Sequence, residues 1–129
     1  VITGAGRAFC SGGNVRTLVA ELARASEEAR RAHNELTSEV VRAMRAMPQP
    51  IVAAINGPAV GGGAAIAIAA DLRMCAKGAT IGFPFPRLGL SAGDMGVSWR
   101  LPRLIGLGRA TEMLLTGQLI DAETAERWG

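Results

Sequence analysis

Residues 51–71 read IVAAINGPAVGGGAAIAIAAD, and the order of residue types in this stretch decides the fold class. Ile51 to Ile55 is a continuous apolar run, which is typical of a strand buried on both faces of a parallel sheet covered by helices. Gly57-Pro58 closes this strand, and Gly61-Gly62-Gly63 opens an apolar helix that ends near Asp71. Strand, turn and buried helix in this order predict an α/β architecture.

The same alternation continues on both sides of this segment. Val1 to Thr3 is β-branched and stops at a glycine, so it predicts the end of a strand. Between residues 15 and 47 apolar residues recur at helical spacing, and Ser26 followed by two glutamates predicts an N-cap that separates a short helix from a long one. Downstream, extended segments are predicted at 72–76 and 80–83, and helices at 99–104, 108–115 and 121–128.

Composition indicates a soluble, intracellular protein without a dedicated nucleic-acid surface. The chain has 129 residues, which fits one domain, and carries 14 Lys and Arg against 11 Asp and Glu, a formal net charge of +3. Its arginines are scattered instead of forming blocks, which argues against a nucleic-acid patch. The longest apolar stretch, Ala59–Ala70, is too short and too rich in glycine to cross a membrane. Cys10 and Cys75 are interpreted as reduced, packed residues, and a cytoplasmic location is expected.

Both ends of the chain indicate an interior piece of a longer protein. The chain begins at Val1 inside a predicted strand, carries no initiator Met, and stops at Gly129 directly after a helical pattern. We therefore expect residues 1–129 to form one partial domain.

The spacing of the glycines argues against two nucleotide-binding patterns. Gly4-Ala5-Gly6 follows a strand as a dinucleotide-binding loop does, but the third glycine of that pattern would fall at Phe9. Gly61-Gly62-Gly63 lacks the following Lys-Ser or Lys-Thr of a phosphate-binding loop. No group of His, Cys and Asp has the spacing of a metal site, so no metal is expected.

The glycine run can instead expose backbone amides. The first N–H groups of a helix have no partner inside the helix and lie at the positive end of its dipole. A carbonyl oxygen placed at Gly61-Gly62-Gly63 would therefore gain negative charge at low cost. The alternative is that the three glycines only let this helix pack closely on the sheet.

Two segments together resemble the signatures of the crotonase, or enoyl-CoA hydratase/isomerase, superfamily. Residues 1–14, VITGAGRAFCSGGN, resemble its first signature, and residues 51–71 resemble its second, at a fitting separation. The later stretches RLGL, LPRLIGLGRATEMLLTG and IDAETAERWG follow in the family's order. The resemblance implies a crotonase-like α/β fold, the ClpP/crotonase spiral of ββα units, here without its first strands and its C-terminal trimerisation helices. It also implies that the parent protein is a homotrimer or a dimer of trimers.

The resemblance also assigns roles to the two glycine segments. It implies that the backbone N–H groups of Gly13 and Gly62 form an oxyanion hole for the thioester oxygen of an acyl-CoA. Ser11, Gly12 and Gly61 adjoin these amides and would contact the CoA ester, with the carbonyl near Ser11 facing the adenine. Coenzyme A is then part of the substrate, in fatty acid metabolism, and no separate cofactor is expected. Two convergent donors would stabilise the enolate that forms in the transition state.

The sequence departs from the family where a hydratase keeps its catalytic acids. By the resemblance, two glutamates that place and deprotonate water would stand at Ala65 and Phe85, and neither of these residues can transfer a proton. Asp94 lies in LGLSAGDMG, which resembles the LGL-x-PD-x-G stretch of several family isomerases, with Ala-Gly where Pro is common. We interpret Asp94 as a lone acid/base. The alternative is that Asp94 caps the helix leading to Trp99.

We therefore expect an enzyme that isomerises an unsaturated or cyclic acyl-CoA through an enolate, with Gly13, Gly62 and Asp94 as its catalytic groups. Two alternatives stay open, namely an enoyl-CoA hydratase with an atypical base and a pseudoenzyme that binds acyl-CoA without turnover. RNA binding ranks third, behind these two alternatives, and strongly salt-dependent affinity would be its mark. The expected partner is the acyl-CoA substrate, with neither nucleic acid nor membrane.

Overall fold

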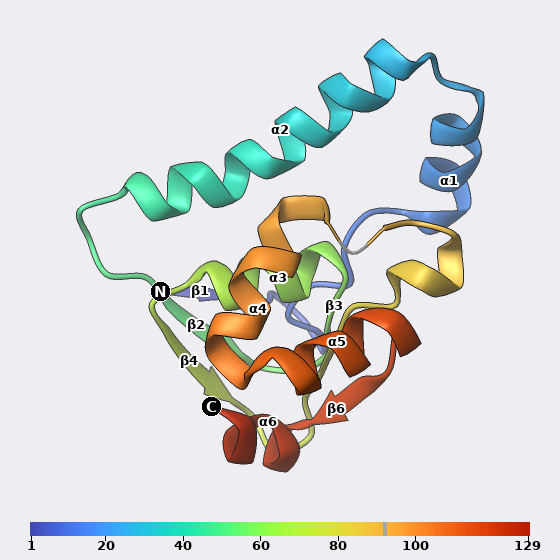
Figure 1. Cartoon of the computed structure of the whole chain (residues 1–129). Helices are drawn as coiled ribbons and strands as arrows, with labels where there is room; N and C mark the ends of the chain where they lie inside the picture. The colour runs from blue at the N-terminus through green and yellow to red at the C-terminus, as the bar shows by residue number, and fades with distance from the viewer. Residues whose placement is uncertain (92) are drawn as a thin grey trace.

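A computed structural model describes residues 1–91 and 93–129 of the chain, with the backbone alone described for Asp94 (Figure 1). Its strands are β1 (Ile2–Thr3), β2 (Val52–Ile55), β3 (Ala59–Val60), β4 (Leu72–Cys75), β5 (Thr80–Gly82) and β6 (Leu119–Asp121). Its helices are α1 (Val15–Arg24), α2 (Glu27–Ala46), α3 (Gly62–Ala69), α4 (Val97–Ile105), α5 (Leu107–Thr116) and α6 (Ala122–Trp128). Short 3-10 segments are η1 (Phe85–Leu88) and η2 (Asp94–Gly96).

Among the described residues the strands form two sheets, and the chain winds from one to the other. The first sheet is parallel, in the order β1-β2-β4, and the second has the order β3-β5-β6 with β6 antiparallel to β5. After β1 the chain turns a corner to Cys10, which bridges Ala59 of β3 in parallel. β2 likewise leads into β3, and β4 leads into β5, while α3 returns the chain from β3 to β4. The predicted spiral of strand, strand and helix is confirmed.

α3 occupies the centre of the fold (Figure 1). Most of its residues are buried, as expected for a helix that is apolar on every side. One side packs with Phe83, Leu101 and Met113, and the other packs with the apolar cluster around Ile55. Each such large side chain stabilises the fold by about 1.5–3 kcal/mol when it is fully buried. α3 is therefore held firmly, and its first residue is Gly62.

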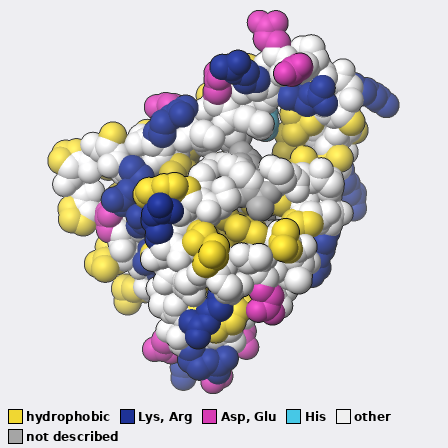
Figure 2. All heavy atoms as spheres, in the orientation of Figure 1, with side chains coloured by type: hydrophobic (Ala, Val, Ile, Leu, Met, Phe, Trp, Pro, Cys, Tyr) yellow, Lys and Arg dark blue, Asp and Glu magenta, His cyan; other side chains and the backbone are white. Residues whose placement is uncertain are grey.

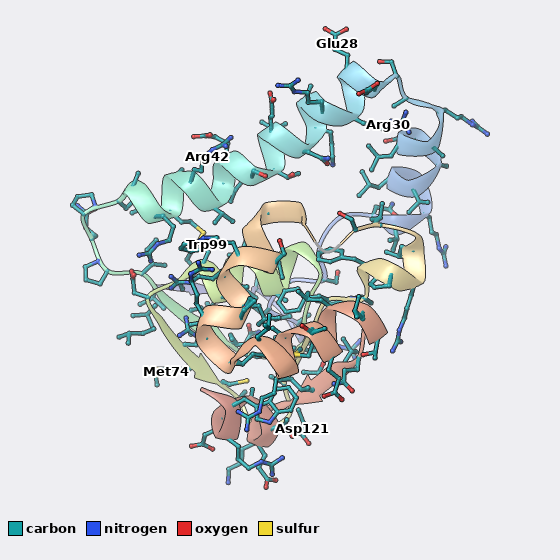
Figure 3. The ribbon with its side chains drawn as sticks, in the orientation of Figure 1. Glu28, Arg30, Arg42, Met74, Trp99 and Asp121 are labelled. Atoms are coloured by element: carbon teal, nitrogen blue, oxygen red, sulfur yellow. The ribbon has the colours of Figure 1, made fainter. Side chains whose placement is uncertain are left out.

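α1 and α2 form an excursion along the outside of the molecule (Figure 1). The predicted division at Ser26 is confirmed, because the Ala29 N–H donates to the Ser26 Oγ at 3.2 Å. Neither helix contains a buried residue among those described, and Leu36 is 71% exposed. Figure 3 shows Glu28 and Arg42 of α2 pointing away from the body of the protein.

Some local features differ from the sequence prediction. β3 and β6 were not predicted, because runs of two and three residues are too short to show an alternating pattern. β2 is fully buried on one face, whereas Val52 and Ala54 on its other face are half-buried. α3 ends at Ala69, near Asp71 as expected, and the Asp71 carboxylate accepts a hydrogen bond from the Ile51 N–H, which was not predicted.

Candidate active site

The two glycine segments predicted to form the oxyanion hole lie against each other. Gly12 has a φ of +80°, in the left-handed region that favours glycine. A Cβ on Gly12 would lie 3.1 Å from the Gly62 nitrogen and 3.2 Å from the Val60 carbonyl oxygen. The first glycine loop (Ser11–Gly13) therefore lies against the first turn of α3, and the fold brings together two signatures that are far apart in the sequence.

The first turn of α3 presents its amides at this contact. The first N–H groups of a helix have no acceptor within the helix. Gly61 is the N-cap of α3 and has no side chain that could accept from them. Gly61 donates its own N–H to the Gly82 carbonyl oxygen at 2.9 Å, and its carbonyl oxygen accepts from the Ala65 N–H at 2.9 Å. The amide of Gly62 thus lies at the positive end of a buried helix dipole.

Close packing explains a different glycine of the same run. A Cβ on Gly63 would overlap the Cys10 carbonyl oxygen, so this position needs glycine for steric reasons. The Cys10 carbonyl oxygen also accepts a hydrogen bond from the Val60 N–H at 2.9 Å. The two interpretations of the glycine run are therefore compatible, because Gly63 serves the packing while Gly62 faces the first glycine loop.

Asn56, which the sequence analysis did not single out, holds the segment that leads into the first glycine loop. The Gly4 N–H donates to the Asn56 Oδ1 at 2.9 Å, and the Asn56 Nδ2 donates to the Gly6 carbonyl oxygen at 2.8 Å. The Cys10 N–H donates to the Pro58 carbonyl oxygen at 3.2 Å. These hydrogen bonds join the corner between β2 and β3 to the segment that leads from β1 to Cys10. An Asn at the end of a buried strand, directly before Gly-Pro, was the available signal.

The wall beside the glycines is apolar. Ala65 and Phe85, which stand where the resemblance places hydratase glutamates, are 1% and 5% exposed and belong to one buried cluster. The Phe85 Cε1 would lie 3.7 Å from a Cβ on Gly61. Hydrogen bonds made next to such a wall are electrostatically stronger than in water, because the local dielectric is low.

Met95 covers Gly62 and has a backbone conformation that side chains rarely adopt. Its φ is +50°, and its Sδ would lie 3.4 Å from a Cβ on Gly62. A non-glycine residue in this region is strained, and such residues are often found at functional sites. Asp94 directly precedes Met95, so its backbone lies close to the glycine contact, while its side chain and Ala92 are outside the described residues. The N-cap position of α4 is Gly96, two residues after Asp94. The alternative that the Asp94 side chain caps this helix falls outside the described residues.

The other residues of the first glycine loop lie at the surface or against α1. Ser11 is exposed, and a Cβ on Gly13 would lie 3.2 Å from the Leu18 Cδ2 of α1. The Asn14 Oδ1 accepts from the Arg16 N–H at 3.1 Å and caps α1. A cavity of about 870 Å³ opens between β4 and the helices α4 to α6, and its lining residues include neither Gly13 nor Gly62.

The surface charge of the protein is mixed, and neither a metal site nor a membrane-spanning helix is found among the described residues. Figure 2 shows basic side chains spread over the visible face with acidic ones among them. Among the described side chains, which do not include that of Asp94, no three His, Cys, Asp or Glu groups gather closely enough to bind a metal ion. Within residues 1–91 and 93–129, no helix combines the length and the apolar character needed to span a bilayer.

Comparison with known families decides the assignment. The whole chain, residues 1–129, matches the family model described as enoyl-CoA hydratase/isomerase. The chain belongs to the enoyl-CoA hydratase/isomerase family. Among its relatives, "Probable enoyl-CoA hydratase echA12" of Mycobacterium leprae is 42% identical, and the match covers 100% of this chain and 45% of the relative. 1,2-Epoxyphenylacetyl-CoA isomerase of Escherichia coli K12 is 33% identical, with coverages of 100% and 49%.

A solved structure confirms the crotonase-like fold of this enoyl-CoA hydratase/isomerase family member. A crystal structure from Streptomyces coelicolor A3(2), provisionally assigned as an enoyl-CoA hydratase, matches with a TM-score of 0.94 and 43% identity. The match covers 98% of this chain and 46% of that one. The chain thus spans about half the length of the curated relatives it matches. Because the relatives' names include both hydratases and an isomerase, family membership alone does not select the reaction.

Proposed function

We propose that this family member isomerises an acyl-CoA ester through an enolate whose oxygen is held by the amides of Gly13 and Gly62. The observation that carries the proposal is the approach of Gly12 to the Gly62 nitrogen at the start of a buried helix. Two backbone donors from separate segments can converge there on one oxygen, and removing such a donor typically costs about 3 kcal/mol of transition-state stabilisation.

The reaction that fits this arrangement is a proton shift along the acyl chain. The Asp94 carboxylate removes a proton from the α-carbon of a 3-enoyl-CoA, and the electron pair moves onto the thioester oxygen. The two amides stabilise the resulting dienolate. Asp94 then returns the proton to the γ-carbon, which gives the 2-enoyl-CoA. A single acid/base is sufficient, since the proton that leaves one carbon is delivered to another.

The buried wall supports isomerisation over hydration. Ala65 and Phe85 carry no ionisable group and lie beside the amides, so neither can place or deprotonate a water molecule. The relationship to 1,2-epoxyphenylacetyl-CoA isomerase favours the same class. Coenzyme A enters as part of the substrate. Assembly as a homotrimer or dimer of trimers, and an intracellular place in fatty acid metabolism, belong to this proposal.

Two other functions follow from specific observations. The names of several relatives favour an enoyl-CoA hydratase, which would require a base other than residues 65 and 85. The loss of both carboxylates favours a pseudoenzyme that binds acyl-CoA without turnover.

The decisive experiment incubates the full-length protein with a 3-enoyl-CoA in heavy water and follows the products by mass spectrometry. We expect a shifted double bond, together with deuterium in those molecules in which the proton on Asp94 exchanges with the solvent before it is returned. Both signals should be lost in Asp94→Asn. Asp121→Asn is a matched control, because Asp121 caps the remote helix α6 and Asn caps equally well.

The other outcomes overturn the proposal in distinct ways. Addition of water to a 2-enoyl-CoA would identify a hydratase with another base. A substrate that binds but neither isomerises nor exchanges its α-proton would identify a pseudoenzyme.

A further inference from the structure

The far end of α3 is closed by arginine side chains from separate elements. Among the described residues, three arginines donate to three successive carbonyl oxygens there. The Arg100 Nε of α4 donates to Ile68 at 3.1 Å, and the Arg73 Nη1 of β4 donates to Ala70 at 2.8 Å. The Arg45 Nη1 of α2 donates to the intervening Ala69 carbonyl oxygen at 3.4 Å.

These bonds replace the cap that α3 lacks. The last carbonyl groups of a helix have no partner within it, and a buried, unpaired carbonyl is costly. The C-cap Ala70 has an extended backbone, with φ −64° and ψ 158°, so no left-handed capping turn supplies the missing donors. The side chains of α3 are apolar and cannot supply them either. The arginines meet this need.

The arginines also stand in a favourable electrostatic position. The carbonyl end of a helix carries the negative end of the dipole, where cations are stabilising. Asp71 is the acid paired with this group, and its Oδ1 lies 2.6 Å from the Arg45 Nη1. Burial, and secondly the nearby Arg100, lower the pKa of Arg73, which shows how closely these cations are gathered.

α3 connects this arginine group to the proposed oxyanion hole. The helix has eight residues and is about 12 Å long, so the arginines fix one end and Gly62 begins the other. Its buried side chains move as one body with the backbone. A displacement of α3 along its axis would therefore move the Gly62 amide relative to the first glycine loop.

We propose that Arg100, with Arg45 and Arg73, is a positioning residue for the oxyanion amide of Gly62, acting through the length of α3. This inference rests on the proposed function, since it assigns the arginines a role only if Gly62 holds the thioester oxygen. Arg100 is the informative member, because it comes from α4, the helix that directly follows the segment of Asp94 and Met95. The Arg100 contact therefore connects the segment of Asp94 and Met95, through α4, to the C-terminal end of α3.

The test measures polarisation of a bound thioester in the full-length protein. The probe is 4-(dimethylamino)cinnamoyl-CoA, whose absorption shifts to longer wavelength when its carbonyl oxygen accepts strong hydrogen bonds. Wild type is compared with Arg100→Met, Arg100→Gln and Arg100→Lys. Arg103→Gln is the matched control, because Arg103 lies on the same helix but stacks on Trp99, with its guanidinium carbon 4.1 Å from the ring centroid.

We expect wild type and Arg103→Gln to show the same red shift, and Arg100→Met to lose much of it. The kcat for isomerisation should fall about tenfold in Arg100→Met with little change in KM, since the misplaced amide acts in the transition state. Arg100→Lys should recover part of both signals, because it keeps a charged donor. If Arg100→Met does not fold, the comparison of the Lys and Gln variants serves the same purpose, with Lys expected to retain more of the shift.

Two outcomes overturn the inference and are distinguishable. A full red shift and a wild-type kcat in folded Arg100→Met, with only a lower melting temperature, would make the arginines purely structural. An absent shift in the wild type would overturn the proposed oxyanion role of Gly62, and the positioning role with it.

Discussion

Ile51 and Asp71 exchange two hydrogen bonds. The Ile51 N–H donates to the Asp71 Oδ2 at 2.8 Å, and the Asp71 N–H donates to the Ile51 carbonyl oxygen at 2.9 Å. This reciprocal pair joins the start of β2 to the start of β4, at the end of α3 that the arginines close. The carboxylate is therefore part of the frame that holds α3, although it lies far from the glycines.

Stability should depend on the protonation of Asp71. Its carboxylate accepts a hydrogen bond from the Ile51 N–H and pairs with Arg45, and these contacts, in that order, hold the pKa below its usual 3.8. A depressed pKa stabilises the folded state above the unfolded value, and the gain is lost as pH falls through the folded value. Urea midpoints of wild type and Asp71→Asn should differ at pH 7. The difference should shrink as pH falls below about 3.8 and disappear once the carboxyl is protonated in the folded state as well. The exposed Glu21→Gln controls for the loss of one charge, and a gap that persists at low pH would contradict the prediction.

Gly12→Ala should disable the site. The new Cβ would lie 3.1 Å from the Gly62 nitrogen at a φ of +80°, so the first glycine loop must move away from α3. We expect kcat/KM to fall about 100-fold, as is typical when catalytic donors are misplaced. Gly6→Ala is the control, since a Cβ there would meet no described atom within 4 Å. Equal losses in both variants would attribute the effect to loop stiffness rather than to the contact with Gly62.

Asn56→Ala should lower both stability and turnover. It removes the hydrogen bonds to Gly4 and Gly6, and exposed or half-exposed bonds of this kind contribute about 1 kcal/mol each. We expect chemical denaturation to show a loss of about 1–2 kcal/mol, with a lower kcat because the first glycine loop is released. Asn34→Ala, on the exposed face of α2, should change stability by less than about 0.5 kcal/mol. A wild-type kcat in Asn56→Ala would show that the glycine loop is held by other contacts.

Ser26→Ala should weaken the start of α2. The Ser26 Oγ accepts from the Ala29 N–H at 3.2 Å, and losing such a cap costs about 1 kcal/mol. Hydrogen exchange of the first α2 amides should become faster, while α3 amides keep their protection. Ser26→Asp retains an acceptor and should behave as wild type, whereas faster exchange in that variant would argue against capping by this side chain.

The sequence was most informative where a pattern is long or chemically specific. The apolar run at 51–55 predicted a strand, Ser26 predicted a helix cap, and the glycine run predicted the start of an apolar helix, and the structure confirms all three. β3 and β6 were not predicted, because these short segments become strands by pairing with β5, and their own residues show no strand pattern. The arginine contacts could not be predicted for a similar reason, since their partners are backbone carbonyl groups of a distant segment. The position of Asn56 before Gly-Pro indicated a turn, but not which backbone groups it would bind.

The site itself divides in the same way. The pairing of Gly12 with Gly62 could be predicted, because a specific motif on each side implies it. Met95 follows Asp94 in the stretch LGLSAGDMG, but its left-handed backbone and its place over Gly62 could not be predicted. Backbone strain is imposed by the surrounding packing, so the left-handed conformation of Met95 cannot be predicted from the residue type alone.

The parallel bridge between Cys10 and Ala59 has a consequence for how such proteins diversify. The chain leaves this bridge through α1 and α2 and returns to the neighbouring strand, so the whole helical excursion is an insertion between two adjacent positions. The solvent-facing residues of α1 and α2 can change without altering the register between Cys10 and Ala59, whereas Arg45, at the end of α2, holds the Ala69 carbonyl oxygen of α3. The outer face of the excursion can therefore diversify separately from the glycine contact, and Arg45 is the point at which the two parts of the chain depend on each other.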